Sequence, residues 1–165
     1  MTDTLATAVL VVATLAMALF AGLFYTYATS IMVGLRRTED RVFVSAMQWF
    51  NATIGNVWFA FSFVGSAVLT VVAAVVHLDG SRRVVLPWIV AALACYGVTF
   101  VITVAVNVPL NNELAAAGEP DRIADVAAVR RRFEARWVRW NVLRAVTSAA
   151  ALACLLWALA LHGRV

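Results

Sequence analysis

The sequence contains no lysine, and charged residues fill only 13% of its 165 positions. A soluble domain of this length has too much surface to carry so little charge, which excludes a soluble globular protein. Hydrophobic residues make up 64% of the chain, and its mean hydropathy is +0.89. The composition therefore indicates an integral membrane protein.

Charge is absent from three long stretches, residues 4–35, 42–76 and 84–112, and from a shorter one, residues 145–161. A helix needs about 20 apolar residues to cross a hydrocarbon core about 30 Å thick, so each stretch can span. None shows the alternation of a barrel strand. We predict an all-α, single-domain, four-helix membrane bundle. The expected spans are about residues 5–30, 54–77, 85–107 and 142–161, joined by helical connections at about 36–53 and 108–141.

All 13 basic residues are arginine, and their distribution is uneven. Ten lie in or beside the connections after spans one and three, against three on the opposite side. By the positive-inside rule, we predict a multi-pass membrane protein with both termini outside and both connections in the cytoplasm. The basic rim favours anionic lipid head groups over nucleic acid, and we interpret Arg130–Arg132 as a solvated or lipid-facing patch.

Cysteine and histidine are scarce. Cys95 and Cys154 lie in mid-span, where we expect small packing residues and not a disulfide. His77 and His162 are expected at the outer ends of spans as polar end residues. No His, Cys or carboxylate set has metal-ligand spacing, so we expect no metal, and no glycine-rich phosphate cradle appears, so we expect no other cofactor. The acidic Asp3 and the length of the first apolar stretch favour a mature helix over a cleaved signal peptide.

Helix breakers are equally scarce. Residues 39–76 contain only Gly55 as a weak breaker, which predicts a continuous helix two that extends into the cytoplasm. Residues 122–161 contain neither glycine nor proline, which predicts a helix four about 60 Å long. Pro109, in contrast, predicts that helix three ends or kinks near Asn107, whose side chain would cap the freed N–H groups.

Polar side chains gather at one level, near the cytoplasmic ends of all four spans. They are Tyr25 and Tyr27 on helix one, Gln48, Asn51 and Asn56 on helix two, Asn107, Asn111 and Asn112 on helix three, and Trp137, Trp140, Asn141 and Arg144 on helix four. Polar groups at membrane depth are costly unless they are paired or face a cavity. Two interpretations stay open. The layer is either interhelical glue or a pocket with aromatic walls and Arg144 as its one fixed positive charge.

Three motifs lie in this layer: "MQWFN" at residues 47–51, "NVPLNNEL" at 107–114 and "RWVRWNVLR" at 136–144. With them, the chain resembles the anthrone oxygenase-like family of small bacterial membrane proteins over most of its length. The resemblance implies a four-helix protein of the bacterial inner membrane. In some members it implies an oxygenase that converts an anthrone to an anthraquinone without a metal or a flavin.

Such chemistry needs a site that holds a flat ring and stabilises a developing enolate. The candidate catalytic residues are those able to hold the enolate by preorganised hydrogen bonds, namely Asn107, Asn111, Asn141 and Arg144. Trp137 and Trp140 can stack the ring. The other candidate substrate-binding residues are Tyr25, Gln48, Asn51, Asn56 and Asn112. No general base is evident, and the nearest carboxylate is Glu113.

Two non-enzymatic functions remain open. The chain can bind or carry a hydrophobic metabolite or lipid in the same pocket, or it can be a scaffold whose cytoplasmic helix docks a partner protein. The expected partners are therefore the lipid bilayer and a small hydrophobic or aromatic molecule, and a homo-oligomer is left open.

Overall fold

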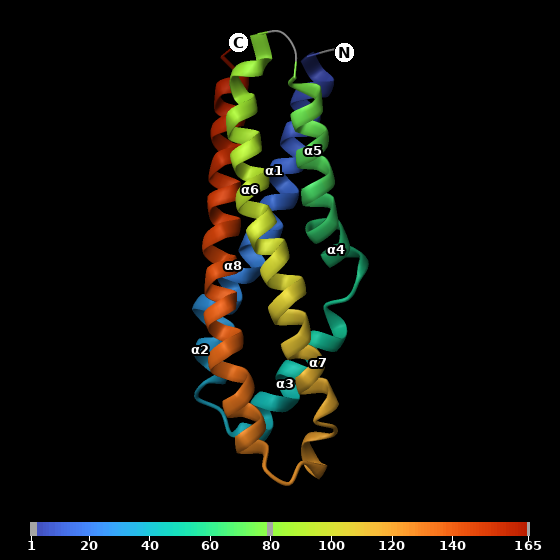
Figure 1. The fold of residues 1–165 in the computed structure, drawn as a ribbon, viewed down its shortest axis with the longest axis vertical. Coiled ribbons are helices and arrows are strands. Elements are labelled where there is room, and N and C mark those ends of the chain that lie inside the picture. Colours follow the sequence, from blue (N-terminus) through green and yellow to red (C-terminus); the bar gives the residue numbers. More distant parts are fainter. Residues whose placement is uncertain (1–2, 79–80, 165) are drawn as a thin grey trace.

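The computed structural model describes residues 3–78 and 81–164 as a helical bundle (Figure 1). Within these residues, four helices are long and apolar enough to cross a membrane. They are Thr4–Leu35, Val57–Val76, Arg83–Ala116 and Val126–His162. This confirms the predicted all-α, four-helix membrane bundle.

Short π-helical and 3₁₀-helical segments, labelled η, divide the helices into shorter α-helical elements. In chain order the elements are α1 (Asp3–Thr26), η1 (Tyr27–Ile31), α2 (Met32–Leu35), α3 (Asp40–Thr53), α4 (Val57–Ala60), η2 (Phe61–Gly65), α5 (Ser66–Val76), η3 (Ser81–Val85), α6 (Leu86–Ile102), η4 (Thr103–Asn107), α7 (Val108–Ala116), η5 (Pro120–Arg122) and α8 (Val126–His162). The start of α1 and the end of α8 lie at one end of the bundle, here called the terminal end (Figure 1). The opposite end, with α2, α3 and α7, is called the loop end.

The long helix four is confirmed, because α8 runs for 37 residues without interruption. Asp125 caps its start by accepting a hydrogen bond from the N–H of Ala128 at 2.8 Å, as expected for a carboxylate at an N-cap. One stripe of α8 is buried along its length, at Arg130, Phe133, Trp137, Asn141, Arg144, Ser148, Ala151, Leu155 and Ala158. Steps of three and four residues keep this stripe on one face, which packs against α1 and α6.

The expected continuity of helix two is wrong at one point. The helix stops after Thr53 and restarts at Val57. Asn56 closes both broken ends: its side-chain oxygen accepts from the N–H groups of Trp58 and Phe59, and its amide donates to the carbonyl of Thr53 at 3.0 Å. A break at membrane depth is tolerated where its backbone groups are satisfied locally. Asn56 therefore acts here as a helix cap.

Helix three was expected to end or kink near Asn107, and the structure contradicts the ending. The helix continues through η4, a π-helical turn in which the N–H of Val108 bonds the carbonyl of Thr103, and the Asn107 side chain makes no capping bond. A wider turn relieves the clash that Pro109 would cause in a regular α-helix. The helix therefore changes its width instead of ending.

Buried apolar side chains form two separate clusters along the bundle. The cluster towards the terminal end is built on Leu10, Met17, Phe20, Phe24, Ala73, Val85, Ile89, Ala92, Tyr96, Ala151, Leu155 and Ala158. The cluster towards the loop end is built on Tyr27, Met32, Phe43, Val44, Met47, Leu110, Leu114, Phe133 and Trp137. On helix one the division falls between Phe24 and Tyr27, at the level of the polar layer.

The scarce histidines and cysteines lie away from that level. His77 is fully buried, and its Nε2 lies 3.2 Å from Nδ1 of His162. The two rings are therefore paired across the terminal end instead of acting as separate polar end groups. Cys95 and Cys154 are free and half-buried, and both pack against the cluster towards the terminal end. The expectation of small packing residues is confirmed.

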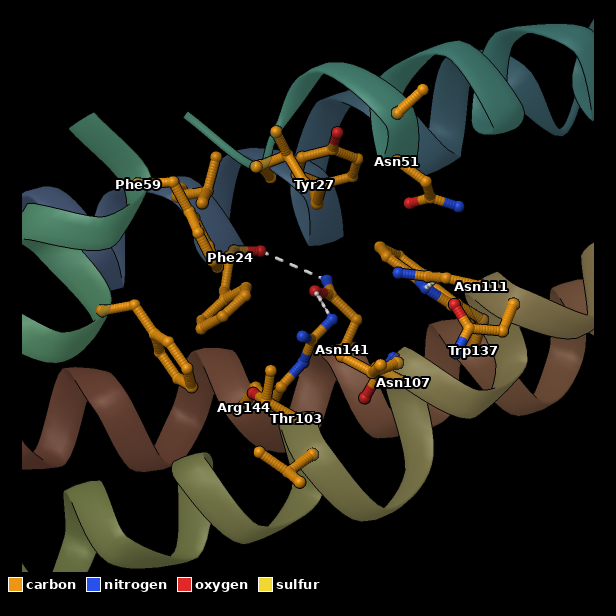
Figure 2. Close-up of a pocket in the computed structure, with 18 of the residues that line it drawn as sticks. Phe24, Tyr27, Asn51, Phe59, Thr103, Asn107, Asn111, Trp137, Asn141 and Arg144 are labelled. Atoms are coloured by element: carbon orange, nitrogen blue, oxygen red, sulfur yellow. Dashed lines mark hydrogen bonds between the residues drawn. The ribbon is translucent and has the colours of Figure 1, made fainter. Parts of the chain in front are cut away.

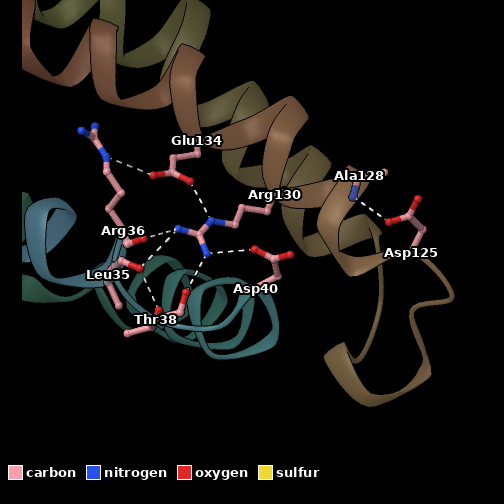
Figure 3. Close-up of polar contacts among 8 residues, drawn as sticks. All are labelled: Leu35, Arg36, Thr38, Asp40, Asp125, Ala128, Arg130 and Glu134. Carbon is pink, nitrogen blue, oxygen red and sulfur yellow. Dashed lines mark hydrogen bonds and ion pairs between the residues drawn. The ribbon is translucent and has the colours of Figure 1, made fainter.

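Arg130 holds the loop end together (Figure 3). Its side chain is 9% exposed, so the interpretation of Arg130–Arg132 as one solvated patch is wrong for its first member. The guanidinium bonds Glu134 at 2.7 Å and Asp40 at 2.9 Å, and it also donates to the backbone carbonyls of Thr38 and Arg36. It thereby satisfies carbonyls at the end of helix one and joins helix four to the start of α3.

Replacing Arg130 with alanine is expected to lower the free energy of unfolding by about 2–3 kcal/mol, because two carboxylates and two carbonyls lose their shared donor. Thermal unfolding of the purified protein in detergent measures this loss. Arg131→Ala is the matched control, since its side chain is exposed and its removal should change the stability by no more than about 0.5 kcal/mol. Equal stability of the two variants would contradict this role for Arg130.

Candidate functional site

A cavity of about 430 Å³ lies between the two apolar clusters, at the level where helix two is broken (Figure 2). All four helices contribute to its wall. The lining residues are Leu23, Phe24, Tyr27, Gln48, Asn51, Ala52, Ile54, Gly55, Phe59, Phe63, Thr103, Val104, Asn107, Val108, Asn111, Asn112, Ala115, Trp137, Asn141 and Arg144. Its volume is within the range of small-molecule sites, about 300–1,000 Å³.

Three π-helical turns surround this cavity. Tyr27 opens η1, Phe63 lies in η2, and Thr103 and Asn107 are the first and last residues of η4. All four side chains line the cavity. A π turn inserts one extra residue into a helix and so rotates the following side chains, which is why such turns are frequent at functional sites.

Arg144 is the one charged residue in the lining. It is 5% exposed, and its Nη2 donates to the side-chain oxygen of Asn141 at 3.1 Å. Asn141 in turn donates to the carbonyl of Phe24 at 3.3 Å. The guanidinium carbon lies 4.2 Å from the centre of the Phe24 ring and 5.4 Å from that of Trp137. Aromatic faces therefore hold this cation.

No carboxylate among the described residues makes an ion pair with Arg144, and its Nε has no hydrogen-bond partner there. Buried charges in proteins are normally paired or bound to a metal, because desolvation of an isolated ion costs several kcal/mol. Arg144 therefore leaves a positive site at the wall that a negative charge on a ligand can neutralise.

Asn107 is 1% exposed, and neither its side-chain nitrogen nor its oxygen has a hydrogen-bond partner among the described residues. The side-chain nitrogen of Asn51 is unpaired in the same way. Each unsatisfied buried polar atom costs about 1–3 kcal/mol. Such a cost is typical of atoms that receive a partner only when a ligand or ordered water is bound.

Asn111 and Gln48 have partners within the fold. The indole N–H of Trp137 donates to the side-chain oxygen of Asn111 at 2.8 Å, which fixes the ring against helix three (Figure 2). The Gln48 amide donates to the carbonyls of Leu114 and Gly118 at 2.9 and 3.0 Å. Gln48 thus satisfies carbonyls at the end of α7 and ties α3 to it.

The cavity brings together eight of the eleven candidate site residues. These are Gln48, Asn51, Asn107, Asn111, Asn112, Trp137, Asn141 and Arg144. The other three, Tyr25, Asn56 and Trp140, do not line it. Glu113, the nearest carboxylate in the sequence, lines a separate groove with Arg132.

Helical geometry explains the three exceptions. Residues two positions apart in a helix lie on nearly opposite faces. Tyr27 is on the buried face, and Tyr25 is therefore 64% exposed. Trp140 lies at the edge of the buried stripe of α8, with its ring centre 5.9 Å from the guanidinium carbon of Arg139. Asn56 caps α4.

Sequence reasoning missed the apolar half of the wall. Phe24, Phe59 and Phe63 belong to or pack against the cluster towards the terminal end, and all three line the cavity. Their rings have the same sequence signature as ordinary core residues. The i,i+3 spacing of Phe24 and Tyr27 could have placed both on one face of helix one. No feature of the neighbouring sequence distinguishes Phe59 and Phe63 from other core residues.

Comparison with known proteins gives one finding. The sequence model of the anthrone oxygenase family matches residues 56–154, a region that includes η4, α7 and most of α8. Neither the curated proteins nor the solved structures contain a match. Since the matched region covers more than half of the chain and carries Asn107, Asn141 and Arg144, the protein belongs to the anthrone oxygenase family.

Proposed function

We propose that this membrane protein is an oxygenase that oxidises a small phenolic, anthrone-like aromatic substrate without a metal or a flavin. The observation that carries the proposal is a buried guanidinium, Arg144, in an aromatic cavity that also contains the amide of Asn107. Among the described residues, Arg144 has no carboxylate partner and the Asn107 amide has no hydrogen-bond partner. Membership of the anthrone oxygenase family supports the class of reaction.

The reaction needs only the substrate and O₂. Removal of a proton from the methylene carbon opposite the anthrone carbonyl gives an enolate whose electrons reduce O₂. A carbon–oxygen bond forms at that carbon, and protonation of the distal oxygen gives a hydroperoxide. Loss of the second methylene hydrogen and cleavage of the O–O bond release water and leave a carbonyl. One anthrone and one O₂ thus give one anthraquinone and one water.

In this proposal, the residues of the cavity stabilise the enolate. Arg144 and Asn107 bind the oxyanion, because fixed donors in a water-poor site stabilise developing charge without reorganisation. Phe24 and Trp137 flank the guanidinium and hold the flat ring system by stacking. Asn111 fixes the Trp137 ring through its hydrogen bond. Neither carboxylate nor imidazole is part of the lining, so in this proposal a water molecule in the cavity takes the methylene proton and returns it to the distal oxygen of the peroxide.

The membrane orientation is part of the same proposal. Four apolar helices support a place in a lipid bilayer, here the bacterial inner membrane. The ten arginines near the loop end support a cytoplasmic location for that end. The cavity then lies at the cytoplasmic interface of the bilayer.

Oxygen consumption by the purified protein with an anthrone tests the proposal, after subtraction of the uncatalysed oxidation. We expect uptake above background that is saturable, yields one anthraquinone per O₂ and persists in the presence of a chelator. Circular dichroism confirms that the sample is folded. Saturable binding of the anthrone without turnover would contradict the oxygenase and support a carrier, and the absence of both would favour a scaffold.

A further inference from the structure

The cavity is closed on one side and open on the other. Its lining residues on α1 and α8 are buried or half-buried. Its exposed lining residues all belong to α3, the break in helix two, η4 or α7, and they are Ala52, Gly55, Val104, Val108, Asn112 and Ala115. The opening therefore lies between the broken part of helix two and helix three. We call it the lateral opening.

The lateral opening lies at the edge of the hydrocarbon core. The part of helix two beyond the break, Val57–Val76, has 20 residues, which is about 30 Å of helix and matches the core thickness. The break at residues 54–56 consequently coincides with the boundary between acyl chains and head groups. Val57 and Trp58, directly after the break, are 73% and 79% exposed, as is typical of lipid-facing residues at an interface.

The rim of the lateral opening is apolar at five of its six exposed lining residues, and Asn112 is the polar exception. Val104 and Val108 form its side on helix three and are 50% and 42% exposed, and Ala52 and Gly55 form the opposite side. A route for a charged solute from water would require polar or charged groups at its rim, because desolvation of an ion is costly. An apolar rim at the membrane boundary fits a molecule that is already dissolved in the bilayer.

Where helix two is broken, the Asn56 side chain replaces part of the lost backbone hydrogen bonding, since it accepts from two N–H groups and donates to the carbonyl of Thr53. The missing helical turn removes side chains that would cover the cavity. At Gly55, a Cβ atom would meet nothing within 4 Å, and its φ is not positive. A larger side chain at Gly55 can therefore extend into open space without strain.

We propose that the ligand passes sideways from the bilayer through the lateral opening, so that the substrate class of this site is an uncharged, membrane-dissolved aromatic molecule. This inference rests on the proposed function for the identity of the ligand as a substrate. The route itself depends only on the geometry of the cavity and its rim.

The test follows the route with a thiol reagent and needs no turnover. Thr103 lines the cavity and is 5% exposed, so Thr103→Cys places a thiol inside it in a Cys95→Ala, Cys154→Ala background. The full chain in phosphatidylcholine–phosphatidylglycerol vesicles is exposed to N-pyrenylmaleimide, which dissolves in the bilayer, or to a sulfonated maleimide, which stays in water. Gly55→Leu and Val108→Trp narrow the lateral opening from its two sides.

We expect faster labelling by the pyrenyl reagent, and a decrease of at least about tenfold in its rate in both narrowed variants, because a narrower route lowers the rate of productive encounter. The matched controls are Gly22→Leu, also without neighbours within 4 Å, and Val101→Trp, also exposed and outside the lining. Both should label at the rate of the parent.

Labelling by the sulfonated reagent at the same rate as by the pyrenyl one, or unchanged labelling in both narrowed variants, would overturn the lateral route. Oxygen uptake on an anthrone by the unlabelled wild-type chain, whose lateral opening is not narrowed, reports separately on the proposed function. Slow labelling in both narrowed variants, with no oxidation by the wild-type chain, would retain the route and reject the oxygenase. Oxidation by the wild-type chain with unaltered labelling in the narrowed variants would do the reverse.

Discussion

Replacing Arg144 with methionine is expected to lower kcat for anthrone oxidation by about 10²–10³-fold, the usual cost of removing one donor that stabilises an oxyanion. The same change should leave the free energy of unfolding unchanged or higher. Arg144 has no carboxylate partner among the described residues, and its Nε is unpaired. Methionine keeps an apolar stem against Phe24 and Trp137 and removes the cost of the buried charge.

The combination of lost activity and retained stability separates a functional residue from a structural one. If Arg144 were interhelical glue, the loss of its hydrogen bond to Asn141 would outweigh the relief of the buried charge, and the melting temperature would fall. Arg139→Met is the matched control on the same helix, since Arg139 is exposed and outside the lining. We expect wild-type oxygen uptake from this control. A destabilised Arg144→Met variant with normal activity would contradict the assignment.

Arg144→Lys tests the geometry of the same group. Lysine keeps the positive charge but loses the planar fork of donors and much of the stacking between aromatic rings. We therefore expect activity between that of the wild type and that of Arg144→Met, with KM less affected than kcat. The difference between the two variants measures how much of the effect comes from charge alone.

Composition and run length were sufficient to predict the class of fold. Four apolar stretches can cross a bilayer only as helices, because every backbone group there needs a partner within its own segment. The uninterrupted α8 followed from the absence of glycine and proline between Arg122 and Leu161. The depth of the site along the bundle could also be predicted, because polar side chains such as the carboxamides and Arg144 are rare in apolar helices and usually line a cavity or an interface.

The sequence did not predict where the helices contain π turns, or which way the side chains after these turns point. The π turns in η1, η2 and η4 have no composition of their own, because they depend on how each helix packs against its neighbours. They decide which side chains line the cavity. The choice of Tyr25 over Tyr27 has a different explanation. Residues two apart lie on nearly opposite faces of a helix, and the sequence does not show which face of helix one is buried.

Asparagine was the hardest residue to interpret, because the same side chain serves as a cap or as a ligand-binding group. Asn56 was predicted to bind substrate, and the structure uses all its hydrogen bonds to close a helix break. Asn107 was predicted both to cap a broken helix and to hold the enolate, and both its polar atoms are without partners among the described residues. The sequence around Pro109 or Gly55 does not show whether a nearby asparagine caps a helix or is free to bind a ligand, because the partner of each amide depends on the backbone geometry.

Replacing Asn107 with leucine is expected to raise the free energy of unfolding by about 1–2 kcal/mol, since two buried polar atoms without partners are exchanged for apolar ones. It should also lower kcat for anthrone oxidation by about 10²-fold through loss of one donor to the enolate. A gain in stability with a loss of activity is typical of a site whose unsatisfied groups serve a ligand.

Asn56→Leu provides the matched control for the stability measurement, because the same chemical change is made at an asparagine whose atoms are all bonded. Loss of the N-cap should lower the free energy of unfolding by about 1–2 kcal/mol, so the two variants shift the melting temperature in opposite directions. Thermal unfolding in one detergent measures both. Destabilisation of both variants would show that Asn107 is bound within the resting fold, and the cavity would then lose its strongest argument for a ligand. Opposite shifts in melting temperature, together with a loss of oxygen uptake in Asn107→Leu, would support binding of the enolate oxygen by the free Asn107 amide.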